Sequence, residues 1–92
     1  MNVRWSDSAV DDLSSICDYT EQRFDTAQAR AVAWAIYDRA DLLRANPFLG
    51  RAGRKPRTRE LPVAGLPFLL IYRVNNDAVE ILRILHGSQQ WP

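Results

Sequence analysis

The sequence predicts an α+β fold in which a hairpin of two helices packs on one face of an antiparallel sheet. Three observations lead to this prediction. The chain has 92 residues, which is enough for one two-layer core but not for two. Its first half holds two stretches with helical periodicity, and its second half holds extended apolar stretches separated by turn residues. We therefore expect one domain over residues 1–92, with the order β-α-α-β-β-β.

A short strand and an amphipathic helix are expected first. Residues 3–5 alternate as a strand does, and the polar residues after them are good helix caps. A helix is therefore expected to begin near Ser8 and to run for about four turns. Its apolar stripe comprises Val10, Leu13, Ile16, Cys17 and Phe24, with Thr20 in the same register.

A second and longer helix is expected over residues 27–45. This stretch is rich in Ala, Leu and Arg and contains no Gly or Pro. Asp25 and Thr26 provide a break and a new cap, and Pro47 ends the helix by restricting the residue before it. Its apolar stripe comprises Ala29, Val32, Ala33, Ile36, Ala40 and Leu43. Because the connection is short, the two helices should form an antiparallel hairpin.

The second half of the chain predicts three strands. Residues 58–63 are extended, residues 64–67 form a turn, and residues 68–74 form a strand that is apolar on both faces. The sequence Asn75-Asn76-Asp77 is typical of a hairpin turn, so residues 79–85 should pair back against the preceding strand. Gly50 and Gly53 open the loop that comes before these strands.

The charge balance conceals two halves of opposite sign. The whole chain has 12 basic and 11 acidic residues, a formal net charge of +1. Residues 1–50 hold five Arg and eight acids, which gives −3, whereas residues 51–92 hold seven basic residues and three acids, which gives +4. Five of those positive charges lie within residues 51–59. This basic segment is expected to be either a solvated loop or a surface for an anionic partner.

Several classes of protein are excluded. Cys17 and His86 are the only residues of their kinds, so no disulfide or Cys/His metal cage can form within the chain. The two glycines near the basic segment lack the following Lys-Ser/Thr of a phosphate-binding loop, and no cofactor is expected. No apolar stretch suggests a secretory leader or a membrane span, so we expect a cytoplasmic protein.

Candidate catalytic and binding residues are few. Asp11, Asp12 and Asp18 are expected on the solvated face of the first helix. His86 followed by Ser88 could act as the base of a metal-free ribonuclease, or His86 could simply end the last strand and hydrogen-bond locally.

Three large rings are conspicuous in so small a domain. Trp34, Tyr37 and Trp91 are expected either to pack in the core or to anchor a partner.

Several motifs resemble the ParE branch of the RelE/ParE toxin family. They are Asn46-Pro47-Phe48-Leu49-Gly50-Arg51, Thr58-Arg59-Glu60-Leu61-Pro62-Val63, Tyr72-Arg73-Val74 and Ile81-Leu82-Arg83-Ile84-Leu85-His86-Gly87, followed by Trp91. The resemblance covers nearly the whole chain. It implies the toxin of a type II toxin–antitoxin pair, with the fold described above and a cognate antitoxin whose C-terminal segment wraps the toxin.

The resemblance also implies an activity. RelE-like members cleave messenger RNA on the ribosome, whereas ParE-like members inhibit DNA gyrase. RelE-like nucleases typically carry an Arg directly after the aromatic residue that opens the central strand, and this chain has Leu69 after Phe68. Leucine cannot stabilise a phosphate charge, so a gyrase inhibitor is favoured over an enzyme. Two alternatives remain open: a metal-free mRNA endonuclease, and an inactive toxin retained as an antitoxin partner, because Gln89 and Gln90 stand where the family commonly has Arg-Asp.

Two sets of binding residues follow from this interpretation. The residues expected to face the target, close to one end of the sheet, are Arg59, Arg83, His86 and Trp91. The residues expected under a ParD-like antitoxin with an acidic C-terminal segment are Ala33, Trp34, Tyr37 and Arg51. Both sets imply a protein that works within a hetero-oligomeric toxin–antitoxin complex.

Overall fold

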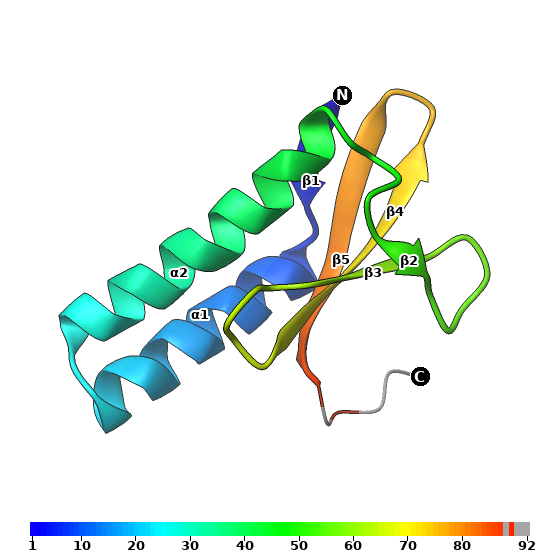
Figure 1. Ribbon diagram of the computed structural model, residues 1–92. Coiled ribbons are helices and arrows are strands. Elements are labelled where there is room, and N and C mark those ends of the chain that lie inside the picture. The colour runs from blue at the N-terminus through cyan, green and yellow to red at the C-terminus, as the bar shows by residue number, and fades with distance from the viewer. Residues whose placement is uncertain (88, 90–92) are drawn as a thin grey trace.

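The computed structural model describes residues 1–87 and residue 89, and it has the predicted α+β architecture (Figure 1). In chain order the elements are β1 (Asn2–Trp5), α1 (Asp7–Arg23), α2 (Thr26–Asp41), the 3₁₀ turn η1 (Leu42–Arg44), β2 (Arg51–Ala52), β3 (Arg59–Pro62), β4 (Phe68–Asn75) and β5 (Ala78–His86). Figure 1 shows α1 and α2 side by side over one face of the sheet. The predicted helical hairpin on a sheet is therefore confirmed.

Side-chain caps fix where both helices begin. The Ser6 hydroxyl accepts a hydrogen bond from the Ala9 backbone N–H at 3.0 Å, and the Asp25 carboxylate accepts one from the Gln28 N–H at 2.7 Å. These bonds satisfy N–H groups that the first turn of a helix leaves unpaired. The second helix is shorter than predicted, because its last turn, Leu42–Arg44, tightens into a 3₁₀ turn before Pro47.

The sheet differs from the prediction in two ways. Its strand order is β1-β5-β4-β3-β2, and β1 pairs with β5 in parallel, whereas the other three pairs are antiparallel as expected. The alternation of residues along a strand carries no information on the direction of its partner. The second difference is the additional strand β2. It has only two residues, which is too short for a sequence pattern to indicate, and these residues were expected to lie in the basic loop.

The main core lies between the helices and the sheet. It includes Val32, Ile36 and Ala40 of α2 together with Leu70 and Ile81 of the sheet. A smaller apolar cluster comprises Leu69, Ile71 and Leu85, with Leu82 packed against it. The residues of β4 therefore divide between two apolar clusters, as its sequence predicted.

Two residues of the predicted stripe on α1 are not buried. Val10 is 51% exposed and Phe24 is 71% exposed, whereas Ala9 and Thr20 face the core. Thr20 is tolerated there because its hydroxyl donates to the backbone carbonyl of Ile16 at 2.7 Å. Leu13 and Ile16 of the predicted stripe pack against the core, whereas the two buried residues of α1 are the small Ala9 and Thr20.

The start of the basic segment is fixed by a close contact between Gly50 and Tyr72. The backbone N–H of Gly50 donates to the Tyr72 hydroxyl at 2.8 Å, and Tyr72 is fully buried. A Cβ atom at position 50 would lie 2.7 Å from both the Glu60 carbonyl oxygen and Cε1 of Tyr72. Only glycine therefore fits here. Burial raises the pKa of Tyr72 above its ordinary value, against the opposing effects of the Gly50 hydrogen bond and of Arg59.

Replacing Tyr72 by Phe should destabilise the protein. Tyr72→Phe leaves the buried Gly50 N–H without a partner, and we expect the free energy of unfolding to fall by about 1–3 kcal/mol. In the wild type, burial favours the neutral phenol, so the unfolded chain loses its proton first as the pH rises. The contribution of Tyr72 to stability is therefore fully present below about pH 10, the pKa of an unfolded tyrosine, and is lost as the pH rises above that value. Urea unfolding between neutral and alkaline pH measures both effects.

The matched control is Tyr19→Phe, because Tyr19 is 59% exposed. It should change the unfolding free energy by less than about 0.5 kcal/mol. Equal midpoints for the two variants would contradict the role given to the Tyr72 hydroxyl.

Candidate functional site

One buried carboxylate organises the start of the basic segment. The Glu60 side chain is 3% exposed, and its two oxygens accept from Nη2 of Arg51 at 3.3 Å and from the backbone N–H of Arg54 at 3.2 Å. Nε of Arg54 lies 3.5 Å from the same carboxylate. Two of the five cations in the segment, Arg51 and Arg54, thus share the single negative charge of Glu60.

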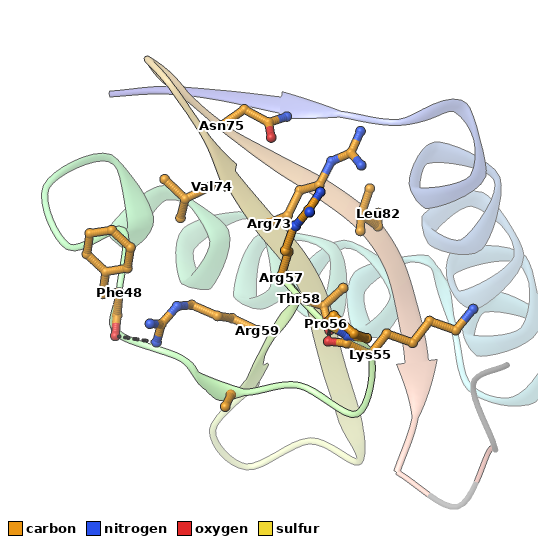
Figure 2. A pocket seen from close by; sticks show the side chains of 11 residues that line it. Phe48, Lys55, Pro56, Arg57, Thr58, Arg59, Arg73, Val74, Asn75 and Leu82 are labelled. Carbon is orange, nitrogen blue, oxygen red and sulfur yellow. Dashed lines mark hydrogen bonds between the residues drawn. The ribbon is translucent and has the colours of Figure 1, made fainter.

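The remaining cations of the segment line a cavity, which we call the basic groove. Figure 2 shows Arg57 and Arg73 in front of the sheet, with Phe48 and Val74 to one side of the strand and the helices behind. The cavity has a volume of about 670 Å³. Its lining residues are Phe48, Ala52, Lys55, Pro56, Arg57, Thr58, Arg59, Arg73, Val74, Asn75 and Leu82.

Arg59 is held in the basic groove by neutral partners. Its Nη1 donates to the Gly50 carbonyl at 2.7 Å and to the Phe48 carbonyl at 3.4 Å, and its guanidinium carbon lies 4.9 Å from the centre of the Phe48 ring (Figure 2). These contacts fix its position without cancelling its charge. By contrast, Arg73 forms an ion pair with Glu80, at 2.6 Å from Nη2 to Oε1.

Arg57 adopts an unusual backbone conformation in this groove. Its φ of 65° lies in the left-handed region, which a bulky residue rarely adopts. Among the residues that the structure describes, its side chain has no hydrogen-bond or ion-pair partner. An uncompensated guanidinium therefore lines the groove.

A second cavity, the helix–sheet groove, lies on the other side of the molecule. It has a volume of about 760 Å³ and is lined mainly by α1, the beginning of α2, the β3–β4 turn and the end of β5. His86 lines it, with its ring edge-on to Phe68 at 6.1 Å between centres. Its backbone N–H donates to Oε1 of Gln89 at 2.6 Å. The local interpretation of His86, as the residue that ends the last strand, fits this position.

Arg83 is bound to Asp12. Nε of Arg83 donates to Oδ2 of Asp12 at 2.7 Å and Nη2 donates to Oδ1 at 3.1 Å, while the backbone N–H of Ile84 donates to Oδ2 at 2.9 Å. The hydrogen bond to Asp12 is the main cause that raises the pKa of Arg83 above its ordinary value. This two-pronged contact joins α1 to β5.

The expectation that Asp12 is solvated is wrong, because its side chain is only 18% exposed. The reason is that β1 ends at Trp5, which leaves the edge of β5 open beyond Ile81. Ser6 covers the first part of this edge by donating to the carbonyls of Ile81 and Leu82, and Asp12 covers the next part. Asp11 and Asp18 are exposed as predicted.

Comparison with known proteins decides the family. A family model described as "ParE toxin of type II toxin-antitoxin system, parDE" matches residues 3–91. The chain belongs to the ParE toxin family. The family predicted from the sequence motifs is thereby confirmed, as is the coarser function, the toxin of a type II toxin–antitoxin system.

Relatives of this ParE chain agree with the assignment. A putative toxin, Y4kP, from Sinorhizobium fredii (strain NBRC 101917 / NGR234) is 42% identical over 90 residues, which cover 98% of this chain and 92% of the relative. Among solved structures, a chain of the chromosomal ParDE TA system from P. aeruginosa superposes with a TM-score of 0.87 at 28% identity, over 94% of this chain and 95% of that one. A YoeB/ParE toxin from Agrobacterium tumefaciens superposes with a TM-score of 0.65 at 19% identity, over 94% and 98% of the two chains, which shows a shared fold.

The residues expected to face the target are not all brought together in this ParE chain. Arg59 lies in the basic groove, whereas His86 and Asp12, the partner of Arg83, line the helix–sheet groove. Trp91 lies outside the described residues. Arg59 and Arg83 are each engaged in contacts that hold the fold together, which the sequence did not indicate.

The rings expected under the antitoxin are exposed on α2. Trp34 is 59% exposed and Tyr37 is 44% exposed, and the two rings meet edge to face with centres 5.9 Å apart. Ala33 beside them is half-buried, and Arg51, on β2, is exposed and paired with Glu60. Of the two interpretations open for Trp34 and Tyr37, packing in the core is therefore wrong.

Arg57, Arg73 and Phe48 were not singled out as site residues from the sequence. Which loop side chains lie beside which strand residues depends on a strand register that only the structure gives. One indication was available: Arg73 breaks an otherwise apolar strand, which is typical of a position that faces solvent.

Neither metal sites nor membrane spans are found in the described part of the chain. Within residues 1–87 and 89, no three His, Cys, Asp or Glu side chains lie close enough together to hold a metal ion. Neither helix has the length and apolar character that a membrane-spanning segment requires, over the same residues.

Removing the Asp12 carboxylate should loosen α1 from the sheet. Asp12→Ala breaks both bonds to Arg83 and leaves the Ile84 N–H unpaired, so we expect the free energy of unfolding to fall by about 2–3 kcal/mol. Asp12→Asn keeps an acceptor for the Ile84 N–H, so its free energy of unfolding should fall by less than that of Asp12→Ala. Chemical denaturation monitored by far-UV circular dichroism measures the difference.

The neighbouring residue supplies the control for this prediction. Asp11→Ala removes the same charge from an exposed position of the same helix and should shift stability by less than about 0.5 kcal/mol. If both alanine variants unfolded at the same denaturant concentration, the Asp12 contact would have no structural importance.

Proposed function

We propose that this ParE-family toxin acts in the cytoplasm by binding and inhibiting DNA gyrase, and that a ParD-like antitoxin neutralises it. The observation that carries the proposal is the chemistry of the basic groove. Its lining residues include four cations but no carboxylate and no imidazole that could move a proton. General acid–base catalysis most often uses such a group, and in a metal-free nuclease it would lie beside the phosphate-binding arginines. The groove is therefore suited to binding rather than to cleavage.

The position of Leu69 supports binding in the same way. Leu69 stands where RelE-like nucleases typically carry an arginine, and it is 7% exposed and packed with Ile71 and Leu85. Its side chain contributes to an apolar cluster and cannot neutralise a phosphate. His86, the other candidate for catalysis, lines a different cavity from the cations.

The exposed rings on α2 support the antitoxin part of the proposal. Trp34 and Tyr37 form a large exposed aromatic pair, and such residues commonly anchor a partner. A disordered segment that folds along α2 would cover them, and acidic residues in its continuation would gain from the positive half of the chain, residues 51–92. Arg51, exposed at the edge of the sheet, offers such a segment a charged end point.

Gyrase inhibition can be tested with purified components. At micromolar excess over gyrase, the toxin should abolish supercoiling of a relaxed plasmid and increase cleaved DNA. His86→Ala should weaken inhibition several-fold, because this exposed ring is a proposed target contact. Arg30→Ala, an exposed substitution on α2, should leave inhibition unchanged. Quantifying the plasmid products by gel electrophoresis measures both effects.

An unchanged rate of supercoiling at that excess of toxin would contradict the gyrase proposal. Induction in cells then separates the remaining possibilities. Rapid loss of messenger RNA without a DNA-damage response would indicate a nuclease, and no effect on growth would indicate an inactive toxin kept as an antitoxin partner.

Antitoxin binding should depend on the two exposed rings. Trp34→Ala and Tyr37→Ala should each weaken binding to the cognate antitoxin by at least about 30-fold, which corresponds to about 2 kcal/mol for a buried aromatic anchor. Isothermal titration calorimetry with the antitoxin measures this change. The free toxins should keep their stability, because both rings are exposed.

The control truncation is Val10→Ala, an exposed apolar residue near the start of α1. It should leave the affinity within a factor of about two. Affinities that stayed unaltered in the Trp34 and Tyr37 variants would place the antitoxin elsewhere.

A further inference from the structure

We propose that the basic groove binds a short stretch of single-stranded nucleic acid, with phosphates on its cations and a base against Phe48. This inference goes beyond the gyrase proposal and does not depend on it, because the binding requires only the toxin and an oligonucleotide. It rests on the charge, the aromatic ring and the position of the groove.

The groove carries more positive charge than its surroundings neutralise. Lys55, Arg57, Arg59 and Arg73 line it, and no acidic residue does. Glu80 pairs with Arg73, but Arg59 bonds only to carbonyl oxygens, and Arg57 has no partner within the described part of the chain. At least two guanidinium groups thus keep their full charge in one cavity, which favours an anion with several charges.

The conformation of Arg57 points in the same direction. A left-handed backbone at a non-glycine residue is disfavoured, and a glycine at this position would relieve it. Glycine would remove the guanidinium from the groove. The residue therefore combines a backbone cost with a charge that the fold itself does not use.

An aromatic ring lies at the edge of the same cavity. Phe48 is 62% exposed, and the Arg59 guanidinium lies over its ring (Figure 2). The rest of the ring is open to solvent, so a nucleobase can stack on it, and the adjacent guanidinium adds a cation–π contribution. Cations that follow the backbone together with a ring for the base are the combination that single-strand binding proteins use.

The position of the groove favours nucleic acid over an acidic peptide. The groove lies on a sheet face, where the backbone N–H and C=O groups of β3, β4 and β5 are used in the strand ladders. A peptide strand would find few main-chain partners there. Phosphates and a base need only side chains, which the groove provides. Its volume of about 670 Å³ is that of a pocket for a small organic ligand, so it suits one or two unpaired nucleotides rather than a duplex.

Fluorescence anisotropy with labelled short oligonucleotides tests the proposal. The purified toxin should bind single-stranded DNA or RNA more tightly than the duplex of the same sequence. With the Arg57 and Arg59 guanidinium groups on two phosphates, the slope of log K against log salt should be about −1.4, so affinity should fall about sevenfold between 50 and 200 mM salt. Tighter binding of DNA would indicate single-stranded DNA as the ligand, and tighter binding of RNA would indicate single-stranded RNA; either result supports binding in the groove.

Three variants give the proposal its specificity. Arg57→Gly should weaken binding about fivefold near 0.1 M salt and make the negative slope of log K against log salt shallower by about 0.7. It should not lower the melting temperature. Phe48→Leu should weaken binding at least fivefold and leave the slope unchanged, since only stacking is lost. Arg30→Ala, which removes an exposed charge from the helical face, should change neither.

Four results would overturn the proposal: no measurable binding at low salt, Arg57→Gly and Arg30→Ala binding equally well, the duplex being preferred, or a poly-glutamate peptide displacing the oligonucleotide at equal charge concentration. None of these would bear on gyrase inhibition, which the supercoiling reaction reports separately.

Discussion

The contact between Gly50 and Tyr72 is the constraint on which the position of the basic segment depends. Tyr72 is fully buried in β4, and its hydroxyl receives the Gly50 N–H, while the Gly50 carbonyl receives Nη1 of Arg59. Arg59 is also the β3 residue that pairs in register with Tyr72. Both ends of the segment are therefore held at one point of the sheet. Side-chain charges that would otherwise move with a free loop are thereby fixed relative to β4.

Holding the segment in this way also divides its charges. Glu60 lies directly after the segment and is buried, so it needs cationic partners, and it takes Arg51 and the backbone and side chain of Arg54. Arg57 and Arg59 remain without a carboxylate and line the groove. The five positive charges that the sequence shows as one run are thus two sets with different roles. One set satisfies a buried acid, and the other is available to a ligand.

Local patterns predicted the elements well, and long-range pairings account for what they missed. The caps at Ser6 and Asp25 and the stripe of α2 could be read from the sequence because they depend on neighbours a few residues apart. The parallel pairing of β1 with β5 and the role of Asp12 join residues more than 70 positions apart, and no local pattern encodes them. For the site, the exposed rings and the basic run were identified, but the groove was not. Its members come from the segment that leads into β3, from β4 and from β5, and they are brought together by the pairing of β3 with β4 and of β4 with β5.

The two proposed binding surfaces lie on opposite sides of the sheet, which constrains how an antitoxin could block both. Trp34 and Tyr37 project from α2 on the helical side, whereas the basic groove opens on the other face. A segment confined to α2 would leave the groove accessible. A segment that continued to the edge strand β2 would reach Arg51, whose exposed guanidinium can take a new carboxylate while Glu60 keeps its contacts to Arg54. The basic segment would then keep its position. The antitoxin segment would block the groove by covering it from the β2 edge, without any rearrangement of the loop.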